Sequence, residues 1–262
     1  MNEYNHIEIR ISEGVAVVWL NRPEKRNAFN SGMISELTEL FRDPELMKSR
    51  LVVIRGKGPA FCAGADLGYM KNIAAFGEEE NYQDAMNLAA LFQAVYTFEA
   101  PTLAAVHGAC FGGANGLMAA CDIVVAEEDT VFAFSEVRLG IAPATIAPYV
   151  MNRTGAYPGK ELMLTGRRFT AQEAHHAGLV DKVAEPGMLE EAINEYVKSF
   201  RAAAPGAVRA TKQLIHKITP PPGKELTGET ARIIARLRAS DEGQEGLSAF
   251  FEKRKPGWNN PE

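Results

Sequence analysis

Cysteine is scarce in this sequence, and its placement argues against two common uses of the residue. Among 262 residues there are three cysteines, and no C-x-x-C pair occurs. An odd number without paired spacing gives no basis for a disulfide framework or a zinc site. We expect Cys62, Cys110 and Cys121 to be small buried apolar side chains in a reducing compartment, with a catalytic thiol as the less favoured alternative.

Long apolar runs and an excess of positive charge are also missing. No apolar stretch reaches the length needed to cross a bilayer. The segment Met1–His6 lacks the basic and apolar parts of a secretory signal. A net charge of -5 at pH 7 gives no electrostatic reason to bind nucleic acid or an anionic membrane. We therefore expect a cytoplasmic protein without a nucleic-acid or membrane partner.

What is present is the composition of a globular protein with a sizeable core, 46% hydrophobic and 23% charged. Alternating apolar and polar residues predict a hairpin over residues 7–20. Apolar runs predict buried strands at residues 51–55, 102–106, 123–126 and 131–134. Helical spacing begins at Ser31 and recurs at residues 69–100 and 114–120. This alternation predicts an α/β core over residues 1–187.

Beyond residue 187 the strand patterns end. Residues 188–218 and 225–252 have helical patterns, separated by the proline-rich segment 219–223. We expect residues 188–262 to form a C-terminal helical region that takes part in oligomerisation.

Two glycine-rich segments, residues 60–67 and 107–116, carry most of the functional information. Each follows a predicted buried strand and leads into a segment that can be helical. A turn between a strand and a helix leaves backbone N–H groups unpaired, and Gly or Ala lets a ligand approach them closely. Two such turns facing each other would hold one carbonyl oxygen between two N–H donors, which is an oxyanion hole. Tight turns without a function are the alternative, and neither segment has the pattern of a phosphate loop or a dinucleotide fingerprint.

Several motifs occur together in a fixed order along the chain. They are Asn21-Arg22-Pro23 with Asn27-Ala28, residues 61–67, Gly112-Gly113 followed by Cys121-Asp122, Glu136 with Leu139-Gly140, Leu164-Thr165-Gly166, and a tail running from Glu245 to Arg254. In this order the chain resembles the crotonase superfamily, also called the enoyl-CoA hydratase/isomerase family, over residues 7–258. The resemblance implies a crotonase-type spiral of ββα turns followed by helices, assembled as trimers or hexamers. It also implies an acyl-CoA thioester as substrate, with no separate cofactor because coenzyme A is part of the substrate.

The resemblance further implies roles for particular residues. The family's oxyanion hole corresponds to the backbone N–H groups of Ala65 and Gly113, and its proton-transferring glutamate corresponds to Glu136. The thioester and its CoA moiety are expected to lie along Lys25, Arg26, Ala28, Ala63, Asp66, Leu67, Gly112 and Gly116. No metal site is implied.

The chain departs from the family's two-base pattern at one position. Hydratases with two glutamates use the first to activate water, and Gly116 stands at that position here. The remaining Glu136 follows an apolar strand, where partial burial would raise the pKa of its carboxyl and suit proton transfer. A surface cap at the strand end is the alternative. We expect the missing side chain at Gly116 to leave room for a branched β-carbon of the substrate.

The chain is similar in detail to a bacterial branch of methylglutaconyl-CoA and carboxygeranoyl-CoA hydratases, which belong to leucine and acyclic-terpene breakdown. That branch also lacks the first glutamate, so the similarity implies hydration of a branched enoyl-CoA. An isomerase that uses one glutamate is the alternative. A non-catalytic relative that binds acyl-CoA or RNA is disfavoured by the negative charge and by the retained Glu136.

Other polar residues have a structural reading beside the functional one. Arg138 could pair with a substrate carboxylate, but a structural charge after the strand is favoured. His107 is expected to make a hydrogen bond within its turn, and the pair His175-His176 lacks a partner for a metal. The basic run 253–255 could contact CoA phosphates or end a helix in solvent.

Overall fold

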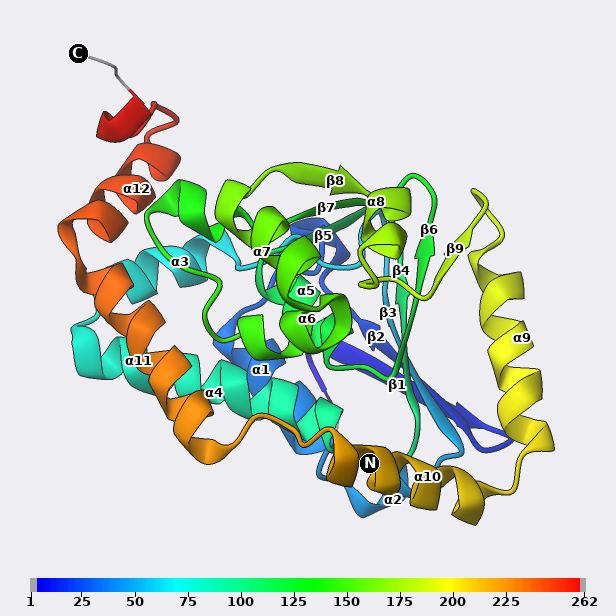
Figure 1. The fold of residues 1–262 in the computed structure, drawn as a ribbon. Helices are drawn as coiled ribbons and strands as arrows, with labels where there is room; N and C mark the ends of the chain where they lie inside the picture. Colours follow the sequence, from blue (N-terminus) through cyan, green and yellow to red (C-terminus); the bar gives the residue numbers. More distant parts are fainter. Residues whose placement is uncertain (1–3, 260–262) are drawn as a thin grey trace.

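Two β-sheets and the helices around them make up the computed structural model, which describes residues 4–259 (Figure 1). The strands are β1 (Ile7–Ser12), β2 (Val15–Leu20), β3 (Leu51–Gly56), β4 (Thr102–Val106), β5 (Ala109–Phe111), β6 (Ile123–Glu127), β7 (Val131–Ala133), β8 (Arg168–Thr170) and β9 (Lys182–Ala184). The helices are α1 (Ser31–Leu40), α2 (Pro44–Met47), α3 (Leu67–Ala74), α4 (Glu78–Tyr96), α5 (Gly113–Ala119), α6 (Ala147–Thr154), α7 (Ala156–Thr165), α8 (Ala171–His176), α9 (Leu189–Ala202), α10 (Pro205–Ile218), α11 (Lys224–Ala239) and α12 (Asp241–Phe251).

The larger sheet has the strand order β1-β2-β3-β4-β6-β9, and every neighbouring pair is parallel except β1 with β2. The predicted hairpin at residues 7–20 is therefore confirmed. Both faces of this sheet are covered. Along β3, Val52 and Ile54 enter the main core, whereas Leu51 and Val53 enter a second cluster on the other face. Because side chains alternate between the two faces of a strand, a sheet covered on both faces requires such an unbroken apolar run.

The smaller sheet contains β5, β7 and β8, with β5 parallel to β7 and β8 antiparallel to it. A single bridge between Cys62 and Cys110 joins the segment after β3 to β5. The chain thus repeats a unit of one strand in the larger sheet, a shorter stretch in the smaller sheet and a helix, as in β4, β5 and α5. This arrangement confirms the predicted α/β fold with its spiral of ββα turns.

Local signals set the helix starts where the sequence allowed a prediction. The side chain of Asn30 accepts a hydrogen bond of 2.8 Å from the N–H of Met33 and caps α1. Thr170 and Glu173 form a capping box at α8. Within residues 4–259, no helix is long and apolar enough to cross a membrane.

The C-terminal helices pack on the core, as Figure 1 shows. Leu189 and Ile193 of α9 join the cluster on the outer face of the larger sheet, and α11 lies along α4. The helical patterns at 188–218 and 225–252 are confirmed. The boundary after residue 187 and a role in oligomerisation stay predictions, and residues 260–262 of that region lie outside the described residues.

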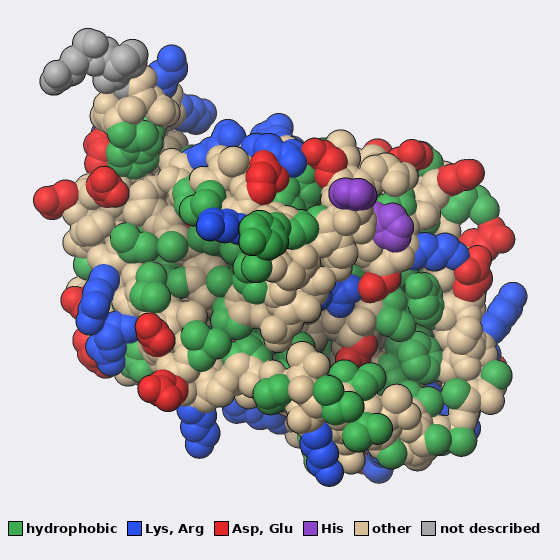
Figure 2. Space-filling view, viewed as in Figure 1, with side chains coloured by type: hydrophobic (Ala, Val, Ile, Leu, Met, Phe, Trp, Pro, Cys, Tyr) green, Lys and Arg blue, Asp and Glu red, His purple; other side chains and the backbone are tan. Residues whose placement is uncertain are grey.

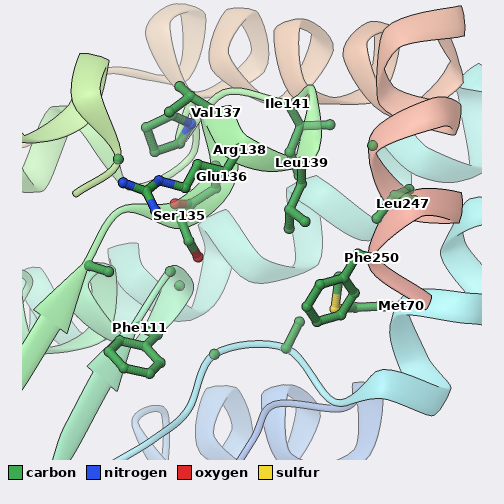
Figure 3. Close-up of a pocket in the computed structure, with 18 of the residues that line it drawn as sticks. Met70, Phe111, Ser135, Glu136, Val137, Arg138, Leu139, Ile141, Leu247 and Phe250 are labelled. Atoms are coloured by element: carbon green, nitrogen blue, oxygen red, sulfur yellow. The ribbon is translucent and has the colours of Figure 1, made fainter. Parts of the chain in front are cut away.

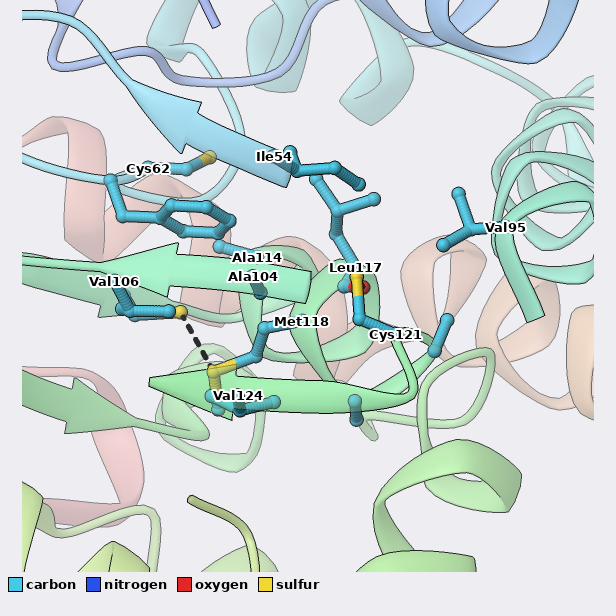
Figure 4. Close-up of a cluster of buried hydrophobic side chains, with 14 of the residues drawn as sticks. Ile54, Cys62, Val95, Ala104, Val106, Ala114, Leu117, Met118, Cys121 and Val124 are labelled. Carbon is cyan, nitrogen blue, oxygen red and sulfur yellow. Dashed lines mark hydrogen bonds between the residues drawn. The ribbon is translucent and has the colours of Figure 1, made fainter. Parts of the chain in front are cut away.

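The three cysteines are free and buried, as expected. Figure 4 shows Cys62 and Cys121 among apolar side chains of the main core, including Ile54, Leu117 and Val124. Burial raises the pKa of Cys62 and of Cys121 to about 12. Since the thiolate is the reactive form, these thiols are inert apolar packing groups.

Candidate active site

A large cavity of about 1030 Å³ lies at the ends of β5 and β7 in the smaller sheet, where α3, α11 and α12 meet the core. Figure 3 shows Ser135, Glu136 and Arg138 on one side of it and the apolar Met70, Leu247 and Phe250 on the other. A cavity with an apolar body and a few convergent polar groups is the usual form of a small-molecule site.

Two unpaired backbone N–H groups face this cavity, one on each glycine-rich turn. Ala65 and Gly113 both line it, and within residues 4–259 neither N–H donates a hydrogen bond to another group of the chain. Gly113 is the first residue of α5, where a helical N–H has no partner inside the helix. Ala65 follows Gly64, whose φ of +92 requires a glycine.

The two turns are tied to each other through the main chain. The N–H of Phe111 donates to the carbonyl of Cys62 at 3.1 Å, and the N–H of Cys62 donates to the carbonyl of Ala109 at 3.1 Å. A Cβ added to Gly64 would lie 3.1 Å from the carbonyl oxygen of Phe111. The turns predicted from the sequence therefore do come together, because β5 pairs with the segment after β3.

Glu136 is the acidic side chain of the cavity lining, and it is half-buried. Strand β7 ends at Ala133, so Glu136 lies in a 3₁₀ helix, Ser135–Leu139, rather than at the end of the strand itself. Its Oε2 atom is buried and has no hydrogen-bond partner among the described residues. Oε1 lies 3.3 Å from the place where a Cβ on Gly112 would be. The surface-cap alternative is therefore wrong.

Burial sets the charge state of this carboxyl. Loss of water around it raises the pKa of Glu136 from 4.5 to about 7, against the smaller opposing effects of its own backbone N–H and the positive charge of Arg238. A carboxyl with a pKa near neutrality can both take and give a proton at physiological pH.

The predicted substrate-binding residues divide into two groups. Ala63 and Gly112 line the cavity together with Ala65 and Gly113. The remaining ones lie outside its lining within the part of the chain that the structure describes, and they are Lys25, Arg26, Ala28, Asp66, Leu67 and Gly116.

The first five of those lie on two neighbouring segments beside the cavity. The N–H of Ala63 donates to the carbonyl of Arg26 at 3.0 Å, which holds the loop of Lys25 and Arg26 against the first glycine-rich turn. The carboxylate of Asp66 is engaged within the protein, since it caps α3 and pairs with Arg22 at 3.1 Å. Leu67 is 57% exposed and Ala28 is buried. Contact of these residues with CoA stays a prediction.

The expectation for Gly116 is wrong. This glycine is buried inside α5, and a Cβ on it would lie 2.3 Å from Cγ2 of Ile146 and 2.9 Å from Cε2 of Phe92. Ile146 itself lines the cavity. The space that a side chain at Gly116 would enter is therefore filled with apolar atoms, and no room for a substrate branch exists above it.

A polar network at the cavity wall escaped sequence reasoning. Arg238 is buried, and its Nη1 donates to Oδ2 of Asp84 at 2.8 Å. The hydroxyl of Tyr69 donates to the other oxygen of Asp84. Both Tyr69 and Arg238 line the cavity. Tyr69, Asp84 and Arg238 lie on α3, α4 and α11, far apart in the sequence, so no local pattern predicts that they meet.

Helix α12 supports the segment that carries Glu136 by direct backbone contact. A Cβ on Gly246 would lie 2.3 Å from the carbonyl oxygen of Leu139, and a Cβ on Gly140 would lie 2.3 Å from the carbonyl oxygen of Glu242. Glycines are required at both positions because backbone meets backbone there. Helix α12 thus fixes the 3₁₀ helix of Glu136.

The remaining polar candidates have mixed outcomes. His107 makes a hydrogen bond of 2.9 Å to the carbonyl of Gly58, which confirms the turn role. Figure 2 shows histidine side chains at the surface over α8, the helix that carries His175 and His176. No cluster of metal-binding side chains occurs within the described part of the chain. Arg138 lines the cavity, is exposed, and makes no hydrogen bond or ion pair within residues 4–259. A structural ion pair for Arg138 is therefore not found in this part of the chain.

Comparison with known proteins agrees with this fold. The model of the enoyl-CoA hydratase/isomerase family matches residues 10–261. A relative from Thermus thermophilus is 38% identical over 95% of this chain and 99% of its own length. The mevalonyl-coenzyme A hydratase of Aspergillus fumigatus is 34% identical over 93% of this chain and 91% of its own length. The crystal structure of an enoyl-CoA hydratase from Shewanella pealeana matches with a TM-score of 0.78 and 36% identity, covering 98% of this chain and 97% of that one.

The fold and these matches define a class of enzymes. The chain belongs to the enoyl-CoA hydratase/isomerase family. The predictions that it is a member of this superfamily and that it is an enzyme are confirmed.

The contact above Gly116 makes a stability prediction. Gly116→Ala is expected to destabilise the protein by about 1–3 kcal/mol, because the new Cβ must displace Ile146. Gly113→Ala is the matched control in the same helix, since its Cβ would lie 3.6 Å from the nearest atom, Cδ2 of Phe29. Denaturant unfolding measures both variants. Adding Ile146→Ala should cost less in the Gly116→Ala background than in the wild type. Equal unfolding midpoints for the two glycine variants would contradict the packing argument.

The raised pKa of Glu136 makes a second stability prediction. Between pH 4.5 and about 7 the folded protein keeps a proton that the unfolded chain has lost, so the free energy of unfolding falls as pH rises through this window. Glu136→Gln removes this loss. The variant is expected to gain on the order of 3 kcal/mol over the wild type at pH 8 relative to pH 4.5. Glu161→Gln is the control, because Arg167 holds the pKa of Glu161 below its ordinary value. A lowered pKa changes stability mainly below pH 4.5, so that variant should change little relative to the wild type between pH 4.5 and 8, and a gain like that of Glu136→Gln would refute the assignment.

Proposed function

We propose that this chain hydrates an enoyl-CoA thioester with a branched acyl group, using Glu136 as its single acid/base. The observation that carries this proposal is the carboxyl of Glu136, whose Oε2 atom is buried without a partner and whose pKa is about 7, in the cavity that two free backbone N–H groups also line. The names of relatives in the family support hydration as the reaction.

The proposed mechanism divides the work between these groups. The N–H groups of Ala65 and Gly113 hold the thioester oxygen and stabilise the negative charge that develops on it. The carboxylate of Glu136 takes a proton from a water molecule as the water oxygen bonds to the β-carbon and the double-bond electrons move into an enolate. Glu136 then returns that proton to the α-carbon. The sum of these steps is the addition of one water.

The acyl group is proposed to be branched and to resemble methylglutaconyl-CoA. A relative named for mevalonyl-coenzyme A, whose acyl group is branched, supports this. The free carboxylate at the far end of such an acyl group would have a partner in Arg138. Arg138 lines the cavity and is free of ion pairs among the described residues. The apolar side at Met70, Leu247 and Phe250 suits the hydrocarbon part of the substrate.

The same proposal covers the surroundings of the site. The CoA moiety is placed along the loop of Lys25 to Ala28 and the segment Ala63 to Leu67. Assembly as trimers or hexamers is supported by the exposed apolar side chains of α10, where Leu214 is 56%, Ile215 is 54% and Ile218 is 74% exposed. A cytoplasmic location without membrane or nucleic-acid partners completes it.

A double-bond isomerase is the second candidate, because one carboxyl can move a proton between two carbons of an enoyl thioester. The isolation of Glu136 from any other acidic side chain of the described cavity lining favours it equally. Product mass separates the two reactions, since hydration adds one water and isomerisation adds nothing.

The acid/base assignment predicts the behaviour of Glu136→Gln as an enzyme. Turnover of enoyl-CoA esters should fall by about two to four orders of magnitude, because the amide cannot take a proton from water. Affinity for the thioester should change little. In the wild type, kcat/KM should rise with pH through about 7 as the carboxyl of Glu136 ionises. Mass spectrometry of products across a panel of enoyl-CoA esters makes the measurement, and near-wild-type turnover in the variant would remove Glu136 from the mechanism.

The acyl assignment predicts a selective effect of Arg138→Gln. Its kcat/KM for methylglutaconyl-CoA should fall by roughly tenfold or more, because a charge-assisted hydrogen bond is lost. Its kcat/KM for 3-methylcrotonyl-CoA, which has the same branch and no second carboxylate, should stay unchanged. Arg167→Gln is the matched control, since Arg167 pairs with Glu161 and Glu173. An equal loss on both substrates, or a wild type that prefers crotonyl-CoA to both branched esters, would refute the proposed acyl group.

A further inference from the structure

The peptide group between Gly112 and Gly113 has an unusual number of hydrogen bonds on one side. The carbonyl of Gly112 accepts from the backbone N–H of Asn115 at 2.9 Å and from the side-chain Nδ2 of Asn115 at 3.3 Å. The same Nδ2 donates to the carbonyl of Ala133 at 2.9 Å, which also accepts from the N–H of Gly112 at 3.0 Å. One asparagine side chain therefore joins the second glycine-rich turn to the end of β7.

Because the peptide group is planar, this contact also sets the direction of the N–H of Gly113. The carbonyl of Gly112 and the N–H of Gly113 belong to one rigid, trans peptide group, so they point in opposite directions. An acceptor held toward Asn115 aims the N–H of Gly113 away from Asn115, on the side where Gly112 and Gly113 line the cavity. Rotation of this peptide would swing the N–H out of the site and turn a carbonyl oxygen into it.

Because both residues are glycines, the Gly112–Gly113 peptide needs hydrogen bonds to keep its orientation. Gly112 has φ 53 and ψ -125, a backbone conformation open to glycine and to few other residues. With glycine on both sides of the peptide, side-chain packing cannot hold its plane. Hydrogen bonds to the carbonyl are the means available.

The second carbonyl in the set ties the turn to Glu136. Ala133 is the last residue of β7, directly before the segment that carries the carboxyl. By donating to Gly112 and Ala133 together, Asn115 fixes the distance between the N–H of Gly113 and the Glu136 segment.

The Asn115 side chain is buried, and its hydrogen-bonding capacity is only partly used. Asn115 is 0% exposed. Its Oδ1 atom is buried without a hydrogen-bond partner among residues 4–259, so it has lost the hydrogen bond that it would make with water. The asparagine contributes the two hydrogen bonds that its Nδ2 donates to the carbonyls of Gly112 and Ala133.

We propose that Asn115 is a positioning residue for catalysis, whose side-chain amide locks the Gly112–Gly113 peptide with the N–H of Gly113 facing the thioester oxygen. The inference rests on the proposed oxyanion role of Gly113. It adds a residue that touches neither the thioester nor the reacting carbons.

Asn115→Leu is the test variant, because leucine fills a similar volume and cannot donate. The kcat for an enoyl-CoA ester should fall by roughly ten- to 100-fold, below the loss expected for a whole oxyanion donor, since the backbone N–H of Asn115 still holds the carbonyl of Gly112. KM should change by less than about threefold, and the pH at half-maximal kcat/KM should not move, because Asn115 does not contact the Glu136 carboxyl.

A spectroscopic signal separates positioning from a general loss of stability. Butyryl-CoA has no double bond to hydrate, so its bound thioester carbonyl can be observed by difference infrared spectroscopy whatever the reaction is. The wild type should shift the carbonyl stretch to lower wavenumber than in free butyryl-CoA, and Asn115→Leu should lose most of that shift. Failure of the proposed function would appear separately, as a wild type that leaves enoyl-CoA esters unhydrated.

The chain offers a closely matched control in Asn81. This asparagine is also 0% exposed, has a partnerless Oδ1, and donates its Nδ2 to the carbonyls of Phe76 and Gly77 at 3.0 and 3.2 Å. Neither it nor its acceptors line the cavity. Asn81→Leu should keep the wild-type kcat and carbonyl shift. The proposal is overturned if Asn115→Leu keeps both, or if Asn81→Leu loses as much as Asn115→Leu at the same unfolding midpoint.

Discussion

The rigidity of the trans peptide group is the constraint on which this site depends. The N–H groups of Ala65 and Gly113 each share a peptide with a carbonyl that accepts a hydrogen bond on the opposite side. The carbonyl of Gly64 accepts from the N–H of Phe29 at 2.7 Å, which orients the N–H of Ala65. The carbonyl of Gly112 accepts from Asn115 and orients the N–H of Gly113. Neither donor is held by its own side chain, so the donors are aimed by hydrogen bonds made behind them, within the packed interior.

Burial provides the other half of the chemistry. The apolar surroundings that pack Ile146 and Phe92 over Gly116 exclude a second carboxyl, and the lack of water around Glu136 raises the pKa of the one that remains. A single group with a pKa near neutrality can serve in both directions of proton transfer, whereas two carboxyls with separated pKa values would divide those tasks. The positive charge of Arg238, which pairs with Asp84, partly opposes this rise in the pKa of Glu136.

Sequence patterns predict the parts of this molecule that are local or continuous. The hairpin, the apolar strand at β3, the caps at Asn30 and Thr170, and both glycine-rich turns follow from residues near one another in the chain. Strands β5, β8 and β9 have three residues each and are too short to show a period. The error at Gly116 has another origin. A sequence shows that a side chain is missing, but it does not show which neighbour fills the space, and here Ile146, the residue before α6, fills it. The network of Tyr69, Asp84 and Arg238 joins three helices, and only tertiary packing brings it together.

The glycine contacts of α12 carry a consequence for sequence variation. Gly246 lies against Leu139, and Glu242 lies against Gly140, so the 3₁₀ helix of Glu136 is supported by a helix that begins at Asp241, far along the chain from it. The two segments meet through backbone atoms, and a side chain at either glycine would push them apart. The residues tolerated at Gly140 and at Gly246 are therefore linked, since a larger residue at either position disturbs one and the same contact.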